Sequence, residues 1–249
     1  MMVNLYNSLA AVYEAMYKTF INYEEEFSLY QQLLIKYNCK SVVEIGCGTG
    51  NLASMFIADG FDYTGMDISE NMLAIAKKNN PECVFLQSNM QNFMLPQPVA
   101  SAIITGRTIS YLLTNKEVSD SIAAINKNLA ANGIVCFDFI DANKFIPQIK
   151  KESILHKAVD GDKKFERESF WSVNLSHSWT FDWRSFFYEE LNDGRLIKIG
   201  EDNSTIRAFT KDEIILFLQL GGFVIKEIIP RITYAFDTFV VVAEKQFDK

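Results

Sequence analysis

The sequence predicts an α/β protein in which a Rossmann-like, mostly parallel sheet of seven strands carries a small inserted antiparallel sheet. A glycine-rich loop follows a short apolar strand, and strands then alternate with helices as far as residue 139. Between residues 165 and 209 the apolar pattern changes to period two, which is typical of strands. Of the 249 residues, 49% are apolar, which is enough for one sizeable core with an insertion.

Charge and composition exclude several classes of function. The net charge of −7 argues against a nucleic-acid partner, because phosphate contacts need clustered Lys and Arg. No apolar run approaches the roughly 20 residues that span a bilayer, so we expect no membrane partner. The N-terminus lacks the basic start of a signal peptide. The four cysteines form no CxxC motif, which predicts a cytoplasmic protein with reduced thiols and no metal site.

The first 40 residues are predicted to form a helical arm ahead of the nucleotide-binding unit. Apolar residues recur at helical spacing over residues 4–20. A second helix should begin at Asn22, with Glu25 three residues later completing a capping box.

The first strand, over residues 41–45, runs into a loop with glycine at every second position: Gly46, Gly48 and Gly50. Glycines let the backbone turn sharply and approach a ligand closely, and the following helix directs its free N–H groups at the loop. The spacing differs from the G-x-G-x-x-G fingerprint of dinucleotide sites. Glu44, just before the loop, repels phosphate and suits a sulfonium or an ammonium. The pattern therefore favours S-adenosylmethionine over NAD or ATP.

The first motif of the class I S-adenosylmethionine-dependent methyltransferases resembles the run Val42-Val43-Glu44-Ile45-Gly46-Cys47-Gly48-Thr49-Gly50. A second feature supports this resemblance. The last two predicted strands, 223–228 and 238–243, have a connection too short for a helix, so they must pair antiparallel at the end of the parallel sheet. The overall layout is similar to small-molecule methyltransferases such as glycine N-methyltransferases and amino-sugar N,N-dimethyltransferases.

The resemblance implies three parts of the chain. Residues 1–40 form the helical arm, residues 41–150 and 205–249 form the Rossmann-like domain that binds S-adenosylmethionine, and residues 151–204 form an inserted antiparallel β lid. In similar enzymes such an arm closes over the cofactor. Tyr6 and Tyr13 would then face the sulfonium with their rings, and packing in an amphipathic helix is the alternative.

Further cofactor contacts are expected after the second and third strands. Asp67 follows Gly50 by 17 positions, close to the position of a ribose-binding acid. Its alternative role, capping the next helix, already suits Ser69. Asn89 replaces the Asp that accepts from the adenine amino group in similar enzymes, and an amide oxygen can still accept that bond. The remaining expected contacts are Cys47, Ile68, Met90 and Thr105.

The segment after the fourth strand, which ends at Thr105, should face the transferred methyl group, because ligands lie beyond the carboxyl ends of parallel strands. Arg107 is expected either to clamp a substrate carboxylate or to pair with an interior acid. Tyr111 is a candidate base. At the end of the fifth strand, Asp138 and Asp141 either bind an amine substrate or cap the following turn.

The inserted stretch has its large apolar residues on one parity, including all three tryptophans. It is predicted to form two strands with a bend inside, and Asn192-Asp193-Gly194 predicts a hairpin turn. The aromatic face should cover either the cleft, as a lid, or a second subunit, as the interface of a homodimer. His177 is predicted on this face, as a packed residue or as a second candidate base.

These observations predict an S-adenosylmethionine-dependent methyltransferase that acts on a small molecule, at nitrogen or oxygen, by in-line displacement. In such a reaction the protein mainly supplies alignment. A protein or peptide methyltransferase and a non-catalytic S-adenosylmethionine-binding protein are the alternatives, and an NAD-dependent oxidoreductase is the rival on the same fold.

Overall fold

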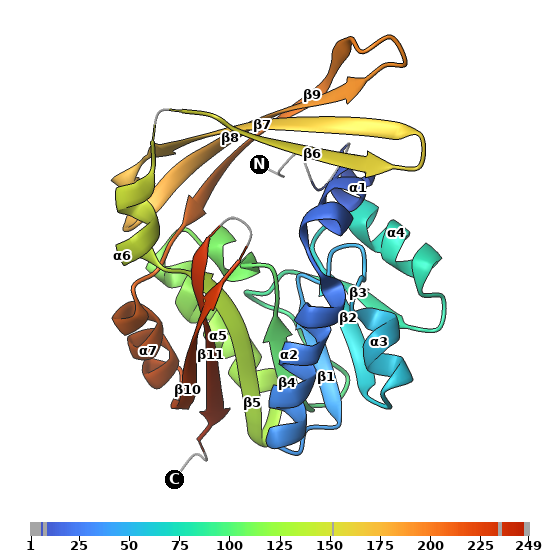
Figure 1. Ribbon diagram of the computed structural model, residues 1–249. Coiled ribbons are helices and arrows are strands. Elements are labelled where there is room, and N and C mark those ends of the chain that lie inside the picture. Colours follow the sequence, from blue (N-terminus) through green and yellow to red (C-terminus); the bar gives the residue numbers. More distant parts are fainter. Residues whose placement is uncertain (1–5, 7–8, 151, 234–235, 247–249) are drawn as a thin grey trace.

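The computed structural model describes residue 6 and residues 9–150, 152–233 and 236–246. Figure 1 shows a central sheet flanked by helices, with a second sheet lying across one end. The central sheet has the strand order β10-β11-β5-β4-β1-β2-β3. Its strands are β1 (Ser41–Ile45), β2 (Asp62–Asp67), β3 (Val84–Gln87), β4 (Val99–Ile104), β5 (Leu129–Ile140), β10 (Phe223–Ile232) and β11 (Asp237–Lys245).

The predicted topology of the central sheet is confirmed. Strands β1 to β5 pair in parallel, and β11 pairs antiparallel with both β5 and β10. The strand order reverses between β1 and β4, which leaves a crevice at the carboxyl ends of these two strands. This is the edge where the glycine loop and the segment after β4 meet.

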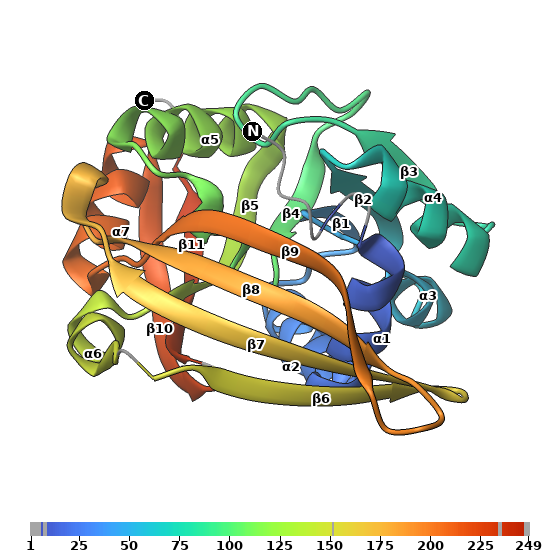
Figure 2. The ribbon, with the colours of Figure 1, turned by 90° about the horizontal axis from the view of Figure 1, so that it is seen from above.

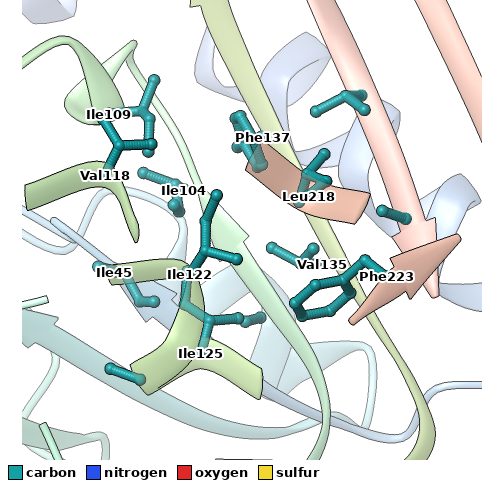
Figure 3. Packing of buried hydrophobic residues seen from close by; sticks show 14 of the residues in the cluster. Ile45, Ile104, Ile109, Val118, Ile122, Ile125, Val135, Phe137, Leu218 and Phe223 are labelled. Atoms are coloured by element: carbon teal, nitrogen blue, oxygen red, sulfur yellow. The ribbon is translucent and has the colours of Figure 1, made fainter. Parts of the chain in front are cut away.

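Two apolar clusters, one on each face of the sheet, hold the helices. One face is covered by α5 (Asn115–Asn128) and α7 (Lys211–Leu220), as Figure 3 shows for Val118, Ile122 and Leu218. The other face is covered by α2 (Tyr23–Lys36), α3 (Ala53–Ala58) and α4 (Glu70–Asn79). None of the described helices is long and apolar enough to span a membrane.

Helix starts follow the capping residues in the sequence. Thr114 and Thr210 form complete capping boxes with Glu117 and Glu213. Asn22 accepts hydrogen bonds from the first turn of α2, as expected for an N-cap. The start of the predicted helix over residues 4–20 lies outside the described residues, and α1 is described from Ala10 to Phe20.

One helix end that the sequence predicts is wrong. Because glycine often ends a helix, the sequence places the end of α5 at Gly133, but the helix stops at Asn128 and β5 already begins at Leu129. The residues between Leu129 and Ile134 bulge out of the ladder with β4, and Asn132 takes a left-handed conformation with φ of 59°. Asn128 is tied down at this point, because its side chain bonds to the backbone of Phe93 and Leu95.

The second sheet is antiparallel, with strands in chain order: β6 (Ile154–Asp160), β7 (Lys163–Val173), β8 (Thr180–Glu190) and β9 (Leu196–Arg207). The predicted hairpin between β8 and β9 is confirmed, and Gly194 in its turn has φ of 82°. The predicted bend is the short turn Leu175–His177 (η4). His177 was expected on the aromatic face; that position is wrong, because the chain leaves the strand after Val173 and His177 is exposed.

The buried face of the second sheet contacts the same chain at both ends. At one end Phe165 and Phe187 pack in a cluster with Met16 of α1 and with Leu9, which precedes this helix. At the other end Phe181 and Trp183 pack in a cluster with Phe145 of α6 (Ala142–Phe145). Figure 2 shows the sheet from above, lying across the arm and the carboxyl edge of the central sheet. The division into domains at residues 40, 150 and 204 stays a prediction.

Candidate functional site

A cavity of about 610 Å³ lies at the carboxyl edge of the central sheet. Its walls come from the glycine loop, from the ends of β1, β2 and β4, from residues 20–26 where α1 ends and α2 begins, and from residues 231–233 at the end of β10. It brings together fourteen of the residues predicted for the site, namely Tyr6, Tyr13, Glu44, Gly46, Cys47, Gly48, Asp67, Ile68, Asn89, Met90, Thr105, Arg107, Tyr111 and Asp138. Three predicted site residues, Gly50, Asp141 and His177, are not among its lining residues.

The glycine loop is fixed by backbone geometry that only glycine tolerates easily. Gly46 has φ of 76°, and a Cβ atom there would lie 2.5 Å from Cγ2 of Thr108. Gly50 has φ of 75° but serves packing, because a Cβ there would meet Asn80, Ala76 and Phe85. The Asn80 side chain donates a hydrogen bond to the Gly50 carbonyl at 3.1 Å. Gly46 thus shapes the cavity, whereas Gly50 shapes the turn behind it.

Asp67, at the end of β2, holds the loop from the opposite side. Its two oxygens accept from the backbone N–H groups of Gly48 at 2.9 Å and Ser69 at 2.8 Å. Burial raises the pKa of Asp67, and these N–H donors oppose the shift. A carboxylate oxygen can accept more than one hydrogen bond, so Asp67 can still accept hydrogen bonds from ligand hydroxyls. Ser69 is the side chain that caps α4.

Glu44 is almost fully enclosed, with 2% of its surface exposed. Its carboxylate accepts from the hydroxyls of Tyr63 at 2.6 Å and Thr105 at 2.8 Å. Burial raises the pKa of Glu44 to about 7, although both hydroxyl donors lower it. The charge of this carboxylate therefore changes in the neutral pH range, and a nearby cation would favour the ionised form.

The arm closes one side of the cavity through polar contacts that the sequence analysis missed. The Thr49 hydroxyl in the glycine loop donates to the carboxylate of Glu14 in α1, and Lys18 pairs with the same carboxylate at 2.6 Å. The hydroxyls of Tyr6 and Tyr111 are hydrogen-bonded at 2.6 Å. The only sequence signal for Glu14 is that it is the one acid in α1.

The segment after β4 is bound to the end of β5. Arg107 has a left-handed backbone with φ of 61°, and its N–H donates to the Asp138 carboxylate at 2.7 Å. Its guanidinium donates to the Thr233 hydroxyl at 3.1 Å and lies 5.3 Å from the ring centre of Phe236. Burial raises the pKa of Asp138, and Arg107 opposes this. Asp141 follows the capping alternative, at the start of α6.

An ion pair between two residues that line the cavity was also not predicted from the sequence. Glu26 of α2 and Arg231 of β10 form a two-pronged ion pair beside the cavity, with one N–O distance of 3.0 Å. No local pattern links two residues 205 positions apart.

The lining of the cavity fits S-adenosylmethionine. The lining has five acids, Glu25, Glu26, Glu44, Asp67 and Asp138, against two arginines, so it favours a ligand that carries positive charge. The ring faces of Tyr6 and Tyr13 suit a cation, and bare backbone at Gly46 and Gly48 admits a flat group. No group of three or more metal-ligating side chains occurs in the part of the chain that the structure describes.

Comparison with known proteins agrees with this fit. A family model described as a methyltransferase domain matches residues 42–133. A putative methyltransferase of Geobacillus sp. (strain WCH70) is 29% identical over 216 residues, which cover 83% of this chain and 84% of that protein.

Two further similarities involve enzymes that act on amino sugars. The dTDP-3-amino-3,4,6-trideoxy-alpha-D-glucopyranose N,N-dimethyltransferase of Streptomyces venezuelae is 28% identical over 95 residues, which cover 38% of this chain and 40% of that enzyme. This alignment thus spans less than half of the dimethyltransferase. The S-adenosylmethionine-bound structure of an amino pentose methyltransferase from Micromonospora echinaspora aligns with a TM-score of 0.80 at 18% identity. That alignment covers 94% of this chain and 97% of the other, and it confirms the fold. Together with the family-model match over residues 42–133 and the antiparallel terminal strands, these similarities support a class I S-adenosylmethionine-dependent methyltransferase.

Proposed function

We propose that this enzyme methylates an amine nitrogen of a small molecule. The observation that carries the proposal is the size and the acidic lining of the cavity. Its volume of about 610 Å³ accommodates the cofactor and a small second ligand, and residues of the arm cover it beside the glycine loop. The acidic lining suits an amine, one relative is named as an amino-sugar N,N-dimethyltransferase, and one structural neighbour is named as an amino pentose methyltransferase.

The residues at the β1 and β2 ends are assigned to the cofactor. Asp67 accepts from the ribose hydroxyls, and Asn89 accepts from the adenine amino group. Glu44 would supply negative charge beneath the loop for the positively charged amino group of the cofactor. Tyr6 and Tyr13 would present ring faces to the sulfonium. An aromatic face tolerates this cation without trapping it as the positive charge on sulfur fades.

Bound S-adenosylmethionine supplies an already activated methyl group, so the residues of the chain mainly align the nucleophile and exclude water. Tyr111 is held in place by its hydrogen bond with Tyr6. Burial raises the pKa of Tyr6 well above its ordinary value, so that phenol stays protonated and serves orientation. Arg107 is permanently charged and cannot act as a base. Asp138 is the lining acid placed beside it that can hold the amine.

The test is transfer of a labelled methyl group. Purified enzyme is incubated with methyl-labelled cofactor and three pools: a set of small amines that includes glycine and D-glucosamine, a set of alcohols, and a denatured protein extract. Label in the amine fraction, absent with the Asp67→Asn variant, supports the proposal. Label confined to alcohols or to protein contradicts it and favours O-methylation or a peptide substrate.

Two other expectations stay predictions. The four cysteines are free, which supports a reducing, cytoplasmic compartment. A homodimer through the second sheet would have to use its outer face, since the aromatic inner face packs against this chain. Analytical ultracentrifugation of the purified protein tests it.

A further inference from the structure

A second, smaller cavity of about 50 Å³ adjoins the main one. The two cavities share six lining residues, Tyr6, Tyr13, Ile21, Gly106, Arg107 and Tyr111. None of the described residues of β6 to β9 lines the main cavity, but Trp183 of β8 and Ile206 of β9 line this side cavity. The second sheet therefore meets the site here.

Two buried polar atoms at the side cavity lack partners. Trp183 is 8% exposed and Ser110 is 1% exposed, and both line the cavity. Neither Nε1 of Trp183 nor Oγ of Ser110 forms a hydrogen bond with any residue that the structure describes. A buried donor left unsatisfied is destabilising, so such atoms are uncommon in folded proteins unless a ligand or water bonds to them.

The charge around the side cavity is opposite to that of the main cavity. Within the described chain, Arg107 is the one charged residue in its lining, and no carboxylate contributes. The other polar side chains there are phenols, a hydroxyl and an indole, all of which can donate hydrogen bonds. An oxygen-bearing anion would satisfy this lining, whereas an ammonium would not.

A second guanidinium lies next to Trp183, one of the residues that line the side cavity. Arg167 of β7 is 2% exposed, and it lies 5.2 Å from the ring centre of Trp183 and 5.7 Å from that of Tyr17. Its described polar partners are the Tyr17 hydroxyl and a ring nitrogen of His156, and no described carboxylate pairs with it. Burial and Arg167 lower the pKa of His156 to about 4, so His156 is neutral at pH 7. A buried, unpaired positive charge adds to the attraction for an anion.

We propose that the side cavity binds a carboxylate of the methyl acceptor, so that the acceptor is a small molecule with both an amine and a carboxylate. Trp183 and Ser110 donate to the carboxylate, and Arg107 neutralises it. The volume suits a group of a few atoms rather than a sugar or a ring system. The inference rests on the proposed function, because it places the amine in the acidic main cavity and the carboxylate in the side cavity.

The protein offers a direct probe, because it has only three tryptophans. The indole N–H signals of the ¹⁵N-labelled enzyme, saturated with S-adenosylhomocysteine, are followed during titration with acetate. Trp183→Phe and Trp171→Phe assign the signals. Trp171 is the matched control, because its Nε1 is also buried and unpartnered but it lines neither cavity. We expect a saturable shift of the Trp183 signal with acetate, little change with acetamide, and no shift for Trp171. An unmoved Trp183 signal overturns the inference.

Kinetics with labelled cofactor supply the second test. Glycine, sarcosine and β-alanine are compared with D-glucosamine and ethanolamine, which lack a carboxylate. We expect Trp183→Phe to raise KM for the carboxylate-bearing acceptor about tenfold with an unchanged Kd for S-adenosylhomocysteine, and Trp171→Phe to leave both unchanged. If amines without a carboxylate are methylated equally well and Trp183→Phe has no effect, the inference fails while the proposed function stands. If no amine is methylated, the proposed function fails, and the acetate titration still decides the side cavity.

Discussion

The hydroxyl of Thr49 in the glycine loop donates a hydrogen bond to the carboxylate of Glu14 in α1, 35 positions earlier in the chain. Through this bond the arm contacts the loop that the cofactor must occupy. The same carboxylate bonds to Asn51 at 3.5 Å, so α1 contacts both the loop and the residue that follows it. Arm position and cofactor affinity should therefore depend on each other.

Removing this contact should weaken cofactor binding. We expect Thr49→Val to raise the Kd for S-adenosylhomocysteine about tenfold, since a hydrogen bond to a charged group contributes ~1.5–3 kcal/mol. Isothermal titration calorimetry measures the effect. Thr19→Val is the control, because Thr19 bonds only within α1, at 3.1 Å from the Ala15 carbonyl. Equal affinities for the two variants would contradict the role of the contact.

Asp67→Asn should lower cofactor affinity by at least tenfold, because Asp67 loses charge-assisted acceptance from the ribose and from the N–H groups of Gly48 and Ser69. The same calorimetric titration gives the Kd. Asp62→Asn, at the exposed opposite end of β2, is the matched control and should bind normally. Unchanged affinity of Asp67→Asn would remove this residue from the site.

A comparison of two glycine substitutions separates the effect of backbone strain from the effect of a steric clash. Gly46 and Gly60 both have positive φ, but a Cβ at Gly60 would meet nothing within 4 Å. Gly60→Ala should therefore lose only the ~1–2 kcal/mol of a left-handed alanine. Gly46→Ala should unfold at a lower temperature than Gly60→Ala, because Thr108 must also move. Differential scanning calorimetry compares the two. A Gly46→Ala melting temperature equal to that of Gly60→Ala would show that Thr108 yields freely.

The buried Glu44 should make stability and binding respond to pH in opposite ways. Its folded pKa of about 7 lies above its ordinary value, so its contribution to stability is present at low pH and is lost as pH rises through 7. Cofactor binding needs the ionised carboxylate and should strengthen over the same range.

The variant Glu44→Gln keeps the shape without the charge. It should melt at a higher temperature than the wild type at pH 8, melt alike at pH 5, and bind S-adenosylmethionine weakly at every pH. Thermal melts and titrations at pH 5, 6.5 and 8 measure this. If the affinity of the wild type relative to that of Glu44→Gln does not change across this range, a group other than Glu44 causes the pH response.

Much of the cavity lining at the ends of β1 and β2 could be predicted, because its signals are local. The glycine spacing, Glu44 just before it and Asp67 after β2 are read from one βαβ segment, and the cavity brings all three places together. Gly50 shows the limit of such motifs: it shares the spacing of Gly46 and a positive φ, yet its contacts are Asn80 and the packing of α4.

The rest could not be predicted, because it depends on pairs far apart in the chain. The contacts of Glu14 with Thr49 and of Glu26 with Arg231 have no local signature. His177 was misplaced for a different reason. The alternating pattern continues through a turn. In this turn the Asn174 side chain accepts a hydrogen bond from the Ser176 N–H group, and the backbone of Ser178 has φ of 64°. Only Asn174 gave a hint of that turn.

Arg167 and Tyr17, which meet beneath the second sheet, are 150 positions apart along the chain. The apolar side of α1 therefore acquires its covering partners, such as Phe165 and Phe187, only after most of the polypeptide has been synthesised. We therefore expect α1 to pack late in folding, and its apolar surface to be open to wrong associations until then.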